Sequence, residues 1–235
     1  YNSGTDAALS NGSYSELIYL AEKKAKKEFV ENQNELDSIV DALGIPNRIG
    51  VGLTEWNIRL CGDGGCDPSY NGVLGGLYTA NFFAQFYESN QYDSVDLRVS
   101  NHYAGVAEGN NLIHTFHYKP SLDSILTTPQ SHSMRIVNST IGGNLIYKDT
   151  TLITGNPSIS IFDEVSPNVF HNINSKAVNI FQSIDSTNNT FNILLLNQDD
   201  ENNYTLTINT PLSFQSDTVF IEKLSGDIDT SLYYI

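Results

Sequence analysis

The residues best suited to chemistry lie in one short run, Gly52-Leu-Thr-Glu55-Trp56-Asn57. A carboxylate beside an aromatic ring at the end of an apolar stretch is the pairing that a glycoside-cleaving site needs, because a carboxylate can act as a nucleophile or as an acid or base. Trp56 is also the only tryptophan of the chain. The alternative for Glu55 is an ordinary role as a helix cap or a surface ion-pair partner.

The elements around this run place Glu55 at the end of a strand. Apolar residues alternate with glycine or threonine from Ile49 to Thr54, which predicts a short strand approached closely by its neighbours. A glycine followed by a proline, Gly44-Ile45-Pro46, ends a helix before it, and an apolar run that suits a helix begins near Gly72. Helix, strand, helix is the rhythm of an α/β barrel, whose chemistry lies at the carboxyl ends of the strands.

The same residues resemble a family. Glu55-Trp56-Asn57 is similar to the nucleophile strand of α-L-arabinofuranosidase-like retaining glycoside hydrolases, whose (β/α)8 barrel carries Glu-Trp-Asn on its seventh strand. A helix with Ala80-Asn81-Phe82-Phe83, a strand with Val99-Ser100-Asn101-His102-Tyr103, a helical run from about Pro129 and then short strands follow in the order that this family shows. The resemblance covers nearly the whole chain.

The resemblance implies a mechanism and roles for six residues. Glu55 would be the nucleophile of a retaining hydrolase, and Trp56 and Asn57 would shape the pocket wall. His102 or Tyr103 would bind sugar hydroxyls, although a buried, internally bonded histidine is an equal alternative. Tyr1 would donate a hydrogen bond to Glu55. The acid/base of the family lies on the fourth barrel strand, outside these residues, and no cofactor is implied.

The predicted fold class is α/β plus all-β, with two domains. Residues 1–149 would form the carboxy-terminal part of a (β/α)8 TIM barrel, and residues 150–235 an antiparallel β-sandwich. Short strands broken by Asn, Asp and Gly support the second assignment; the candidates are 158–162, 177–184, 190–196, 204–208 and 218–223, and 186–189 and 199–202 are predicted hairpin connections. The sandwich is interpreted as a support for the barrel, and a carbohydrate-binding module is the minority view.

Length sets an expectation about partners. A whole barrel takes about 250 residues, with a sandwich still to add, whereas this chain has 235. We therefore expect the missing amino-terminal part of the barrel, or a second chain, to complete it.

An apolar stripe at Leu17, Ala21, Ala25 and Phe29 predicts the first helix, and the polar stretch 31–34 is predicted to split this helix in two.

Charge narrows the partners further. The chain has 27 Asp and Glu against 12 Lys and Arg, a formal net charge of -15, which opposes binding to nucleic acid and to anionic membrane surfaces. A neutral carbohydrate substrate remains compatible, and no membrane insertion is expected. Asn-rich composition and the sequons at Asn11, Asn138, Asn188 and Asn203 suit a secreted or cell-surface glycoprotein.

Two cysteines flank a flexible loop after the Glu55 strand. Cys61 and Cys66 enclose Gly62-Asp63-Gly64-Gly65, so a disulfide between them is predicted, with two free thiols or half of a metal site as alternatives. Asp63 and Asp67 in the same Gly-rich insertion suit calcium, but turn residues in solvent are the simpler interpretation. We predict no metal site.

A second hypothesis belongs to a different class. The acidic, Asn-rich surface also suits a non-catalytic protein derived from a glycosidase, used for surface structure, adhesion or glycan binding. The presence or loss of an Asn-Glu at the fourth barrel strand would distinguish the two hypotheses.

Overall fold

The computed structural model of the chain describes residues 14–56, 61–62, 65–66, 72–92, 94–102, 106–108, 116–142, 145–147, 155–166, 169–199, 201–207 and 221–225. Its helices are α2 (Tyr14–Ala42), α3 (Val73–Tyr92) and α4 (Pro129–Ile141), with the 3-10 turn η2 (Pro120–Leu122). Its strands are β1 (Val51–Trp56), β2 (Cys61–Gly62), β3 (Gly65–Cys66), β4 (Leu97–His102), β5 (Val106–Glu108), β6 (Phe116–Lys119), β7 (Ser124–Thr127), β8 (Leu145–Tyr147), β9 (Ser158–Ser166), β10 (Val169–Lys176), β11 (Val178–Asp185) and β12 (Thr190–Asn197).

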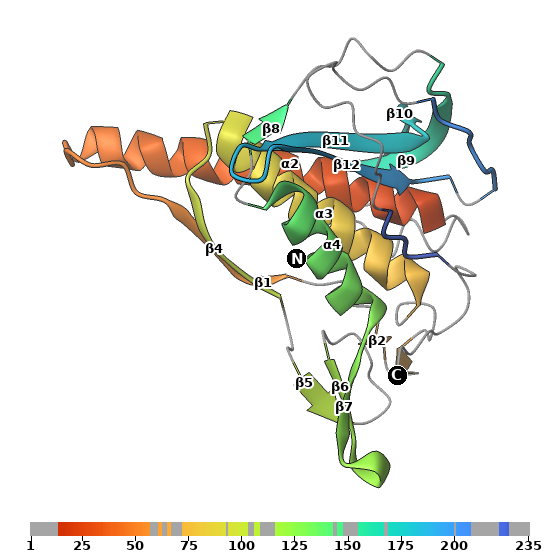
Figure 1. The fold of residues 1–235 in the computed structure, drawn as a ribbon. Coiled ribbons are helices and arrows are strands. Elements are labelled where there is room, and N and C mark those ends of the chain that lie inside the picture. The colour runs from red at the N-terminus through yellow and green to blue at the C-terminus, as the bar shows by residue number, and fades with distance from the viewer. Residues whose placement is uncertain are drawn as a thin grey trace.

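Three helices form a middle layer between two sheets (Figure 1). The parallel pair β1 and β4 lies on one side of α2 and α3, and the antiparallel sheet β12-β11-β8 lies on the other side of α3 and α4. Helix α3 contributes to both cores, since Phe82 packs with β1 and β4 while Ala80 and Ala84 pack with β11 and β12. This explains why the sequence of α3 is apolar on nearly all sides.

The unit β1-α3-β4 is a parallel crossover. Strand β1 pairs with β4 in parallel, from Val51 opposite Leu97 to Trp56 opposite His102. The strand, helix and strand predicted from the sequence over these residues are confirmed. A parallel pair brings the carboxyl ends of both strands to the same edge, so Glu55-Trp56 and Asn101-His102 are neighbours in the backbone.

Helix α2 is one continuous helix, so the predicted split at residues 31–34 is wrong. Ala25, Phe29 and Val40 are buried in line along it, and the polar residue Gln33 occupies the same line and is buried as well. The polar stretch is compatible with one helix, since Glu31, Asn32 and Asn34 are exposed and the buried Gln33 donates hydrogen bonds to Asp37 and to the Ile49 carbonyl.

The carboxy-terminal sheet packs directly on helices. Phe181 of β11 and Leu194 and Leu196 of β12 form one core with Val137 and Ile141 of α4. Strand β8 joins this sheet by pairing with β11, so the sheet draws on residues before the predicted domain boundary at 150. Strands β9 and β10 form a separate antiparallel pair.

Hydrogen bonds also connect the helices to this sheet. Gln198, just after β12, donates from Nε2 to Glu22 Oε2 on α2 at 2.7 Å and to Asn81 Oδ1 on α3 at 3.3 Å. Asn179 of β11 donates to the same Asn81 oxygen at 3.2 Å. These four residues, Glu22, Asn81, Asn179 and Gln198, are called the Glu22 network below.

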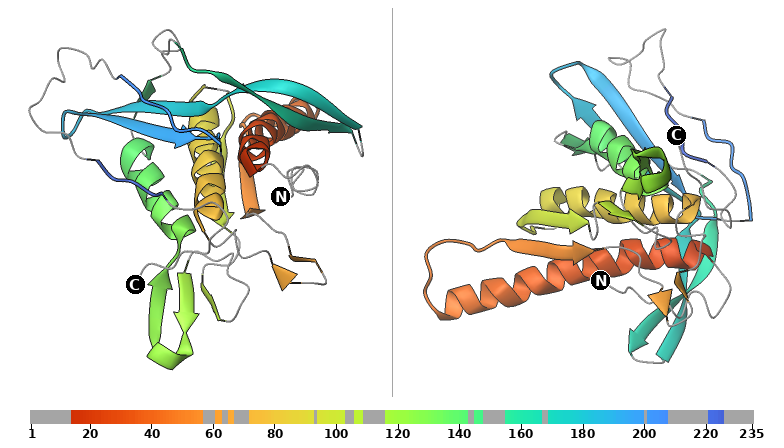
Figure 2. Two further views of the ribbon diagram at one scale, coloured as in Figure 1. Left: turned by 90° about the vertical axis from the view of Figure 1, so that its right-hand side faces the viewer. Right: turned by 90° about the horizontal axis from the view of Figure 1, so that it is seen from below.

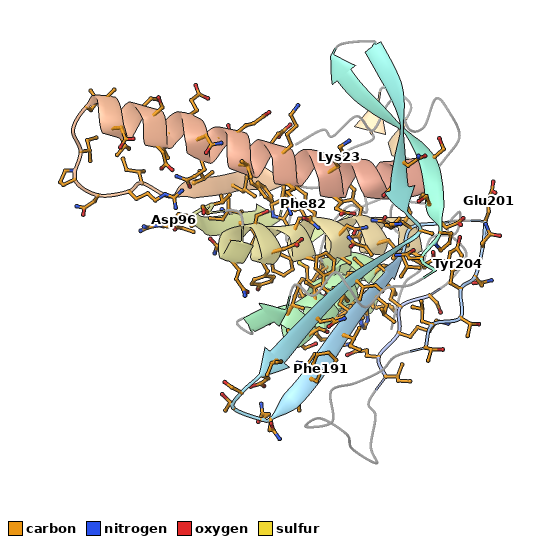
Figure 3. All side chains as sticks on the ribbon, turned by 90° about the horizontal axis from the view of Figure 1, so that it is seen from above. Lys23, Phe82, Asp96, Phe191, Glu201 and Tyr204 are labelled. Carbon is orange, nitrogen blue, oxygen red and sulfur yellow. The ribbon has the colours of Figure 1, made fainter. Side chains whose placement is uncertain are left out.

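The connections at the end of the sheet differ in part from the prediction. The turn 186–189 joins β11 to β12 as predicted, with Asp185 Oδ1 accepting from the Thr187 amide at 2.9 Å. The described parts of the predicted strands 204–208 and 218–223 form no strand. After β12 the chain is instead held in an Asp199 turn, whose Oδ1 accepts from the amides of Glu201 and Asn202, while Tyr204 donates to its Oδ2. Glu201 and Tyr204 lie together at the edge of the molecule in Figure 3.

No described helix is both long and apolar enough to pass through a membrane.

Candidate active site

The candidate site lies at the carboxyl end of β1. Glu55 is the last strand residue but one, and the register shifts between Leu53 and Trp56, which is the signature of a bulge or irregularity. Bulges often occur beside active sites because they change the direction in which side chains point. The backbone of Trp56 lies opposite His102, so the two strand ends that the sequence singles out meet here.

Trp56 is a packing residue in this structure. Its side chain is only 1% exposed, and its ring stacks on Phe82 of α3 with ring centroids 4.3 Å apart and an interplanar angle of 16°. Phe29 of α2 packs edge-on against Phe82, with ring centroids 5.6 Å apart. In Figure 3, Phe82 lies where α3 faces α2. The indole therefore anchors the end of β1 to the helix layer, and the pocket-wall role predicted for Trp56 remains only a proposal.

A buried glutamine fixes the opposite, amino-terminal end of the two strands. Gln33 Nε2 donates to the Ile49 carbonyl at 3.1 Å and to Asp37 Oδ1 at 2.7 Å. Its Oε1 accepts from the Asp96 amide at 3.0 Å. One side chain of α2 thus satisfies backbone groups just before β1 and just before β4, which sets the position of both strands.

Two ion pairs surround this glutamine. Arg48 Nη2 lies 2.8 Å from Asp37 Oδ2, and the hydrogen bond from Arg48 lowers the pKa of Asp37. Arg98 Nη2 lies 2.7 Å from Asp96 Oδ2, and the hydrogen bond from Arg98 lowers the pKa of Asp96. Asp96, which is labelled in Figure 3, directly precedes β4, so it lies at the end of the strand pair opposite to Glu55. Both ion pairs therefore lie at the amino-terminal end of β1 and β4, the end opposite to Glu55.

Gly50 is required for this close approach. A Cβ added at residue 50 would lie 2.6 Å from Arg98 Nε and 2.7 Å from the Asp96 carbonyl oxygen. The sequence expectation that neighbours come very close to the glycines of this strand is confirmed at Gly50. At Gly52 the nearest atom to such a Cβ is Val99 Cβ at 3.9 Å, an ordinary contact.

Two connecting segments with short strands of their own follow the carboxyl ends of β1 and β4. The first follows β1 and contains the pair β2 and β3, in which the backbones of Cys61 and Cys66 lie directly opposite each other. The second follows β4 and contains the sheet β5-β6-β7. Figure 2 (left) shows β2 and β3 on one side and β5 to β7 on the other, both at the end of the molecule where β1 ends.

Several predicted site residues are not described. Tyr1, Asn57 and Tyr103 lie outside the described residues, and only the backbones of Glu55, His102, Cys61 and Cys66 are described. Their roles, and the disulfide, remain predictions. Among the described residues no group of three or more His, Cys, Asp or Glu side chains is arranged to hold a metal ion.

No family model, curated protein or solved structure matches the chain.

Sequence reasoning missed two features. The Gln33 position carried a signal, because a polar residue four positions after Phe29 and seven before Val40 continues an apolar stripe. The sheet β5-β6-β7 carried little signal, since its strands are three or four residues long. His117 lies in β6.

Proposed function

We propose that these residues are part of a retaining glycoside hydrolase that acts on polysaccharide or oligosaccharide, with Glu55 as its nucleophile. The observation that carries the proposal is the parallel unit β1-α3-β4, in which Glu55 lies at the carboxyl end of a strand and beside the carboxyl end of β4. In parallel α/β folds, that edge is where ligands bind and where catalytic groups are found.

The proposed chemistry needs two carboxyl groups about 5 Å apart. Glu55 attacks the anomeric carbon and forms a glycosyl-enzyme, while an acid/base from outside this chain protonates the leaving oxygen and then activates water. Asn57, His102, Tyr103 and Tyr1 are proposed to bind the sugar or orient Glu55. Trp56 contributes by holding the end of β1 against Phe82, at ring centroids 4.3 Å apart.

The proposed partner is the rest of a parallel sheet. Among the described residues, β1 and β4 form a sheet of two strands, and on it Val99 and Gly52 are exposed. Parallel sheets are normally covered on both faces, and small isolated sheets are marginally stable. We infer that further barrel strands, from the same protein or from a second chain, cover this surface. We also propose that the protein is exported to the cell surface or the medium. The sequon residues Asn138, Asn188 and Asn203 are exposed, as glycosylation of an exported protein requires.

The proposal is tested by Glu55→Gln in the protein at its natural length, assayed on an aryl α-L-arabinofuranoside. The substitution removes the attacking charge and keeps the shape of the side chain, so hydrolysis should fall by several orders of magnitude with folding intact. Glu35→Gln is the matched control, because Glu35 is an exposed residue of α2. A Glu55→Gln protein with near-normal turnover would refute the assignment.

One observation favours the second candidate, a non-catalytic scaffold derived from a glycosidase. Trp56 is buried in the core, at 1% exposure, so packing alone is a sufficient reason for an aromatic residue there. The two candidates differ in the acid/base carboxylate, which the enzyme requires and the scaffold does not. Measured hydrolysis that depends on Glu55 decides for the enzyme.

A further inference from the structure

The sheet β5-β6-β7 has one face turned to solvent and one turned to the protein. Ile125 of β7 is 60% exposed, while its neighbour Leu126 is 7% exposed. Successive residues of a strand point to opposite faces, so the Ile125 face is the outer one. We call it the outer face below.

The register places an aromatic residue beside Ile125 on this face. Tyr118 of β6 lies directly opposite Ile125, and Phe116 lies opposite Thr127, two residues along each strand. Directly opposite residues of an antiparallel pair share a face. Phe116 and Tyr118 are both partly exposed. The outer face therefore presents two aromatic rings in a row, with an exposed aliphatic side chain next to the second.

A carboxylate holds the polar end of the second ring. The Tyr118 hydroxyl donates to Asp123 Oδ1 at 3.1 Å, and Asp123 lies in the turn between the two strands with φ of 45°. The hydrogen bond restrains the orientation of the ring. It also places an acceptor at the rim of the apolar surface, where the hydroxyl of a ligand can donate to it.

This combination suits a carbohydrate chain. Binding sites for small polar ligands pair apolar and aromatic surface with a few well-placed polar groups, and tyrosine serves where one end of a contact is apolar and the other is wet. The net charge of -15 opposes an anionic polymer or an anionic membrane surface. The sheet also follows β4 in the order of elements and lies at the end of the molecule where β1 ends (Figure 2).

We propose that the outer face, formed by Phe116, Tyr118, Asp123 and Ile125, is a subsite platform that binds a neutral polysaccharide chain extending away from the Glu55 site. The inference rests on the proposed function, which it deepens by naming how the polymer is held. Tyr118 and Ile125 contact the apolar faces of the sugars, and Asp123 accepts from their hydroxyl groups.

The experiment compares a polymer with a single-sugar substrate, using the protein at its natural length. Neutral wheat arabinoxylan can span the platform, whereas an aryl α-L-arabinofuranoside cannot. Tyr118→Ala should raise KM for arabinoxylan by about tenfold, the loss expected when one aromatic contact is removed, and leave kcat/KM on the aryl glycoside unchanged. Tyr118→Phe keeps the ring and should show a smaller rise, and it replaces the alanine variant if that fails to fold. Leu195→Ser, at an exposed aliphatic residue of β12, is the matched control and should leave the kinetic constants on both substrates unchanged.

Binding without turnover separates this proposal from the proposed function. Affinity electrophoresis of the Glu55→Gln protein in gels with arabinoxylan should show retardation, which Tyr118→Ala abolishes. If the wild type hydrolyses neither substrate, the proposed function fails, and this retardation still tests the platform. The platform is refuted if the Tyr118 variants match the wild type on both substrates and in the gel. It is equally refuted if Tyr118→Ala changes the oligomeric state instead, since the outer face would then bind a second copy.

Discussion

Glu22 should make the stability of this protein fall as pH rises. Its side chain accepts a hydrogen bond from Gln198 within the Glu22 network. Burial raises its pKa from 4.5 to about 7, the hydrogen bond from Gln198 opposes this, and Glu88 adds to the rise while Lys26 opposes it. Lys26 and Glu88 also face each other, with Nζ and Oε2 3.9 Å apart.

The direction of this pH dependence follows from proton binding. Between pH 4.5 and about 7 the folded protein holds the proton on Glu22 and the unfolded chain releases it. Stability falls with pH wherever the folded state binds more protons. The penalty is absent below the unfolded pKa and complete above the folded one. With ~1.36 kcal/mol for each pH unit between the two values, its full size is about 3 kcal/mol.

The perturbation is Glu22→Gln, which is neutral at every pH and still offers an oxygen to Gln198. Urea unfolding of the protein at its natural length, at pH 5, 6, 7 and 8, gives the free energy of unfolding. The variant should be more stable than the wild type by about 1 kcal/mol at pH 5 and by about 3 kcal/mol at pH 8. Glu35→Gln, on the exposed side of the same helix, should show no such widening. A gap that stays constant or narrows with rising pH refutes the reasoning.

Three further predictions follow from the same structure. Gln33→Ala should lower the free energy of unfolding by about 2–3 kcal/mol, because it leaves the Ile49 carbonyl and the Asp96 amide without their buried partner. Asn34→Ala, at an exposed position, should change this free energy little, and equal effects of the two substitutions in urea unfolding would contradict the prediction. Cys61 and Cys66 should be bonded to each other, and mass measurement after alkylation without reductant should add no label; two alkylated cysteines rule the bridge out. Residues 1–235 expressed alone should aggregate or stay partly unfolded, because β1 and β4 pair with no third strand among the described residues; a soluble monomer with one cooperative unfolding transition would show the barrel interpretation to be wrong.

The sequence predicted the elements whose periodicity is strong. Strands β1, β11 and β12 lie where their apolar residues predicted strands, and α3 is apolar on nearly all sides because it packs into two cores. Strand β4 and helix α4 lie where the order of elements in the resembled family placed a strand and a helical run. A strand was predicted at residues 204–208, but its described residues, 204–207, form none. Asp199 instead accepts hydrogen bonds from the Asn202 amide and the Tyr204 hydroxyl, so local turn contacts hold the chain there.

Long-range features of the site were beyond the sequence. Glu22 and Gln198 are 176 residues apart, and no local pattern pairs them. The stacking of Trp56 on Phe82 depends on the crossover of α3, whereas the pocket role expected for the indole came from the resemblance of Glu55-Trp56-Asn57 to a glycosidase strand. The outer face of β5-β6-β7 likewise arises only when two short strands pair in register.

The most direct test of the central claim is to trap the glycosyl-enzyme. Incubating the protein at its natural length with a 2-deoxy-2-fluoro arabinofuranoside that bears a good leaving group should slow hydrolysis of the intermediate and leave the sugar bonded to its nucleophile. Peptide mass spectrometry should then find the added sugar on the peptide that contains Glu55, and Glu55→Gln should abolish the label. A protein that hydrolyses the substrate but carries the label on another residue, or that inverts the anomeric configuration of the product, would contradict the assignment of Glu55.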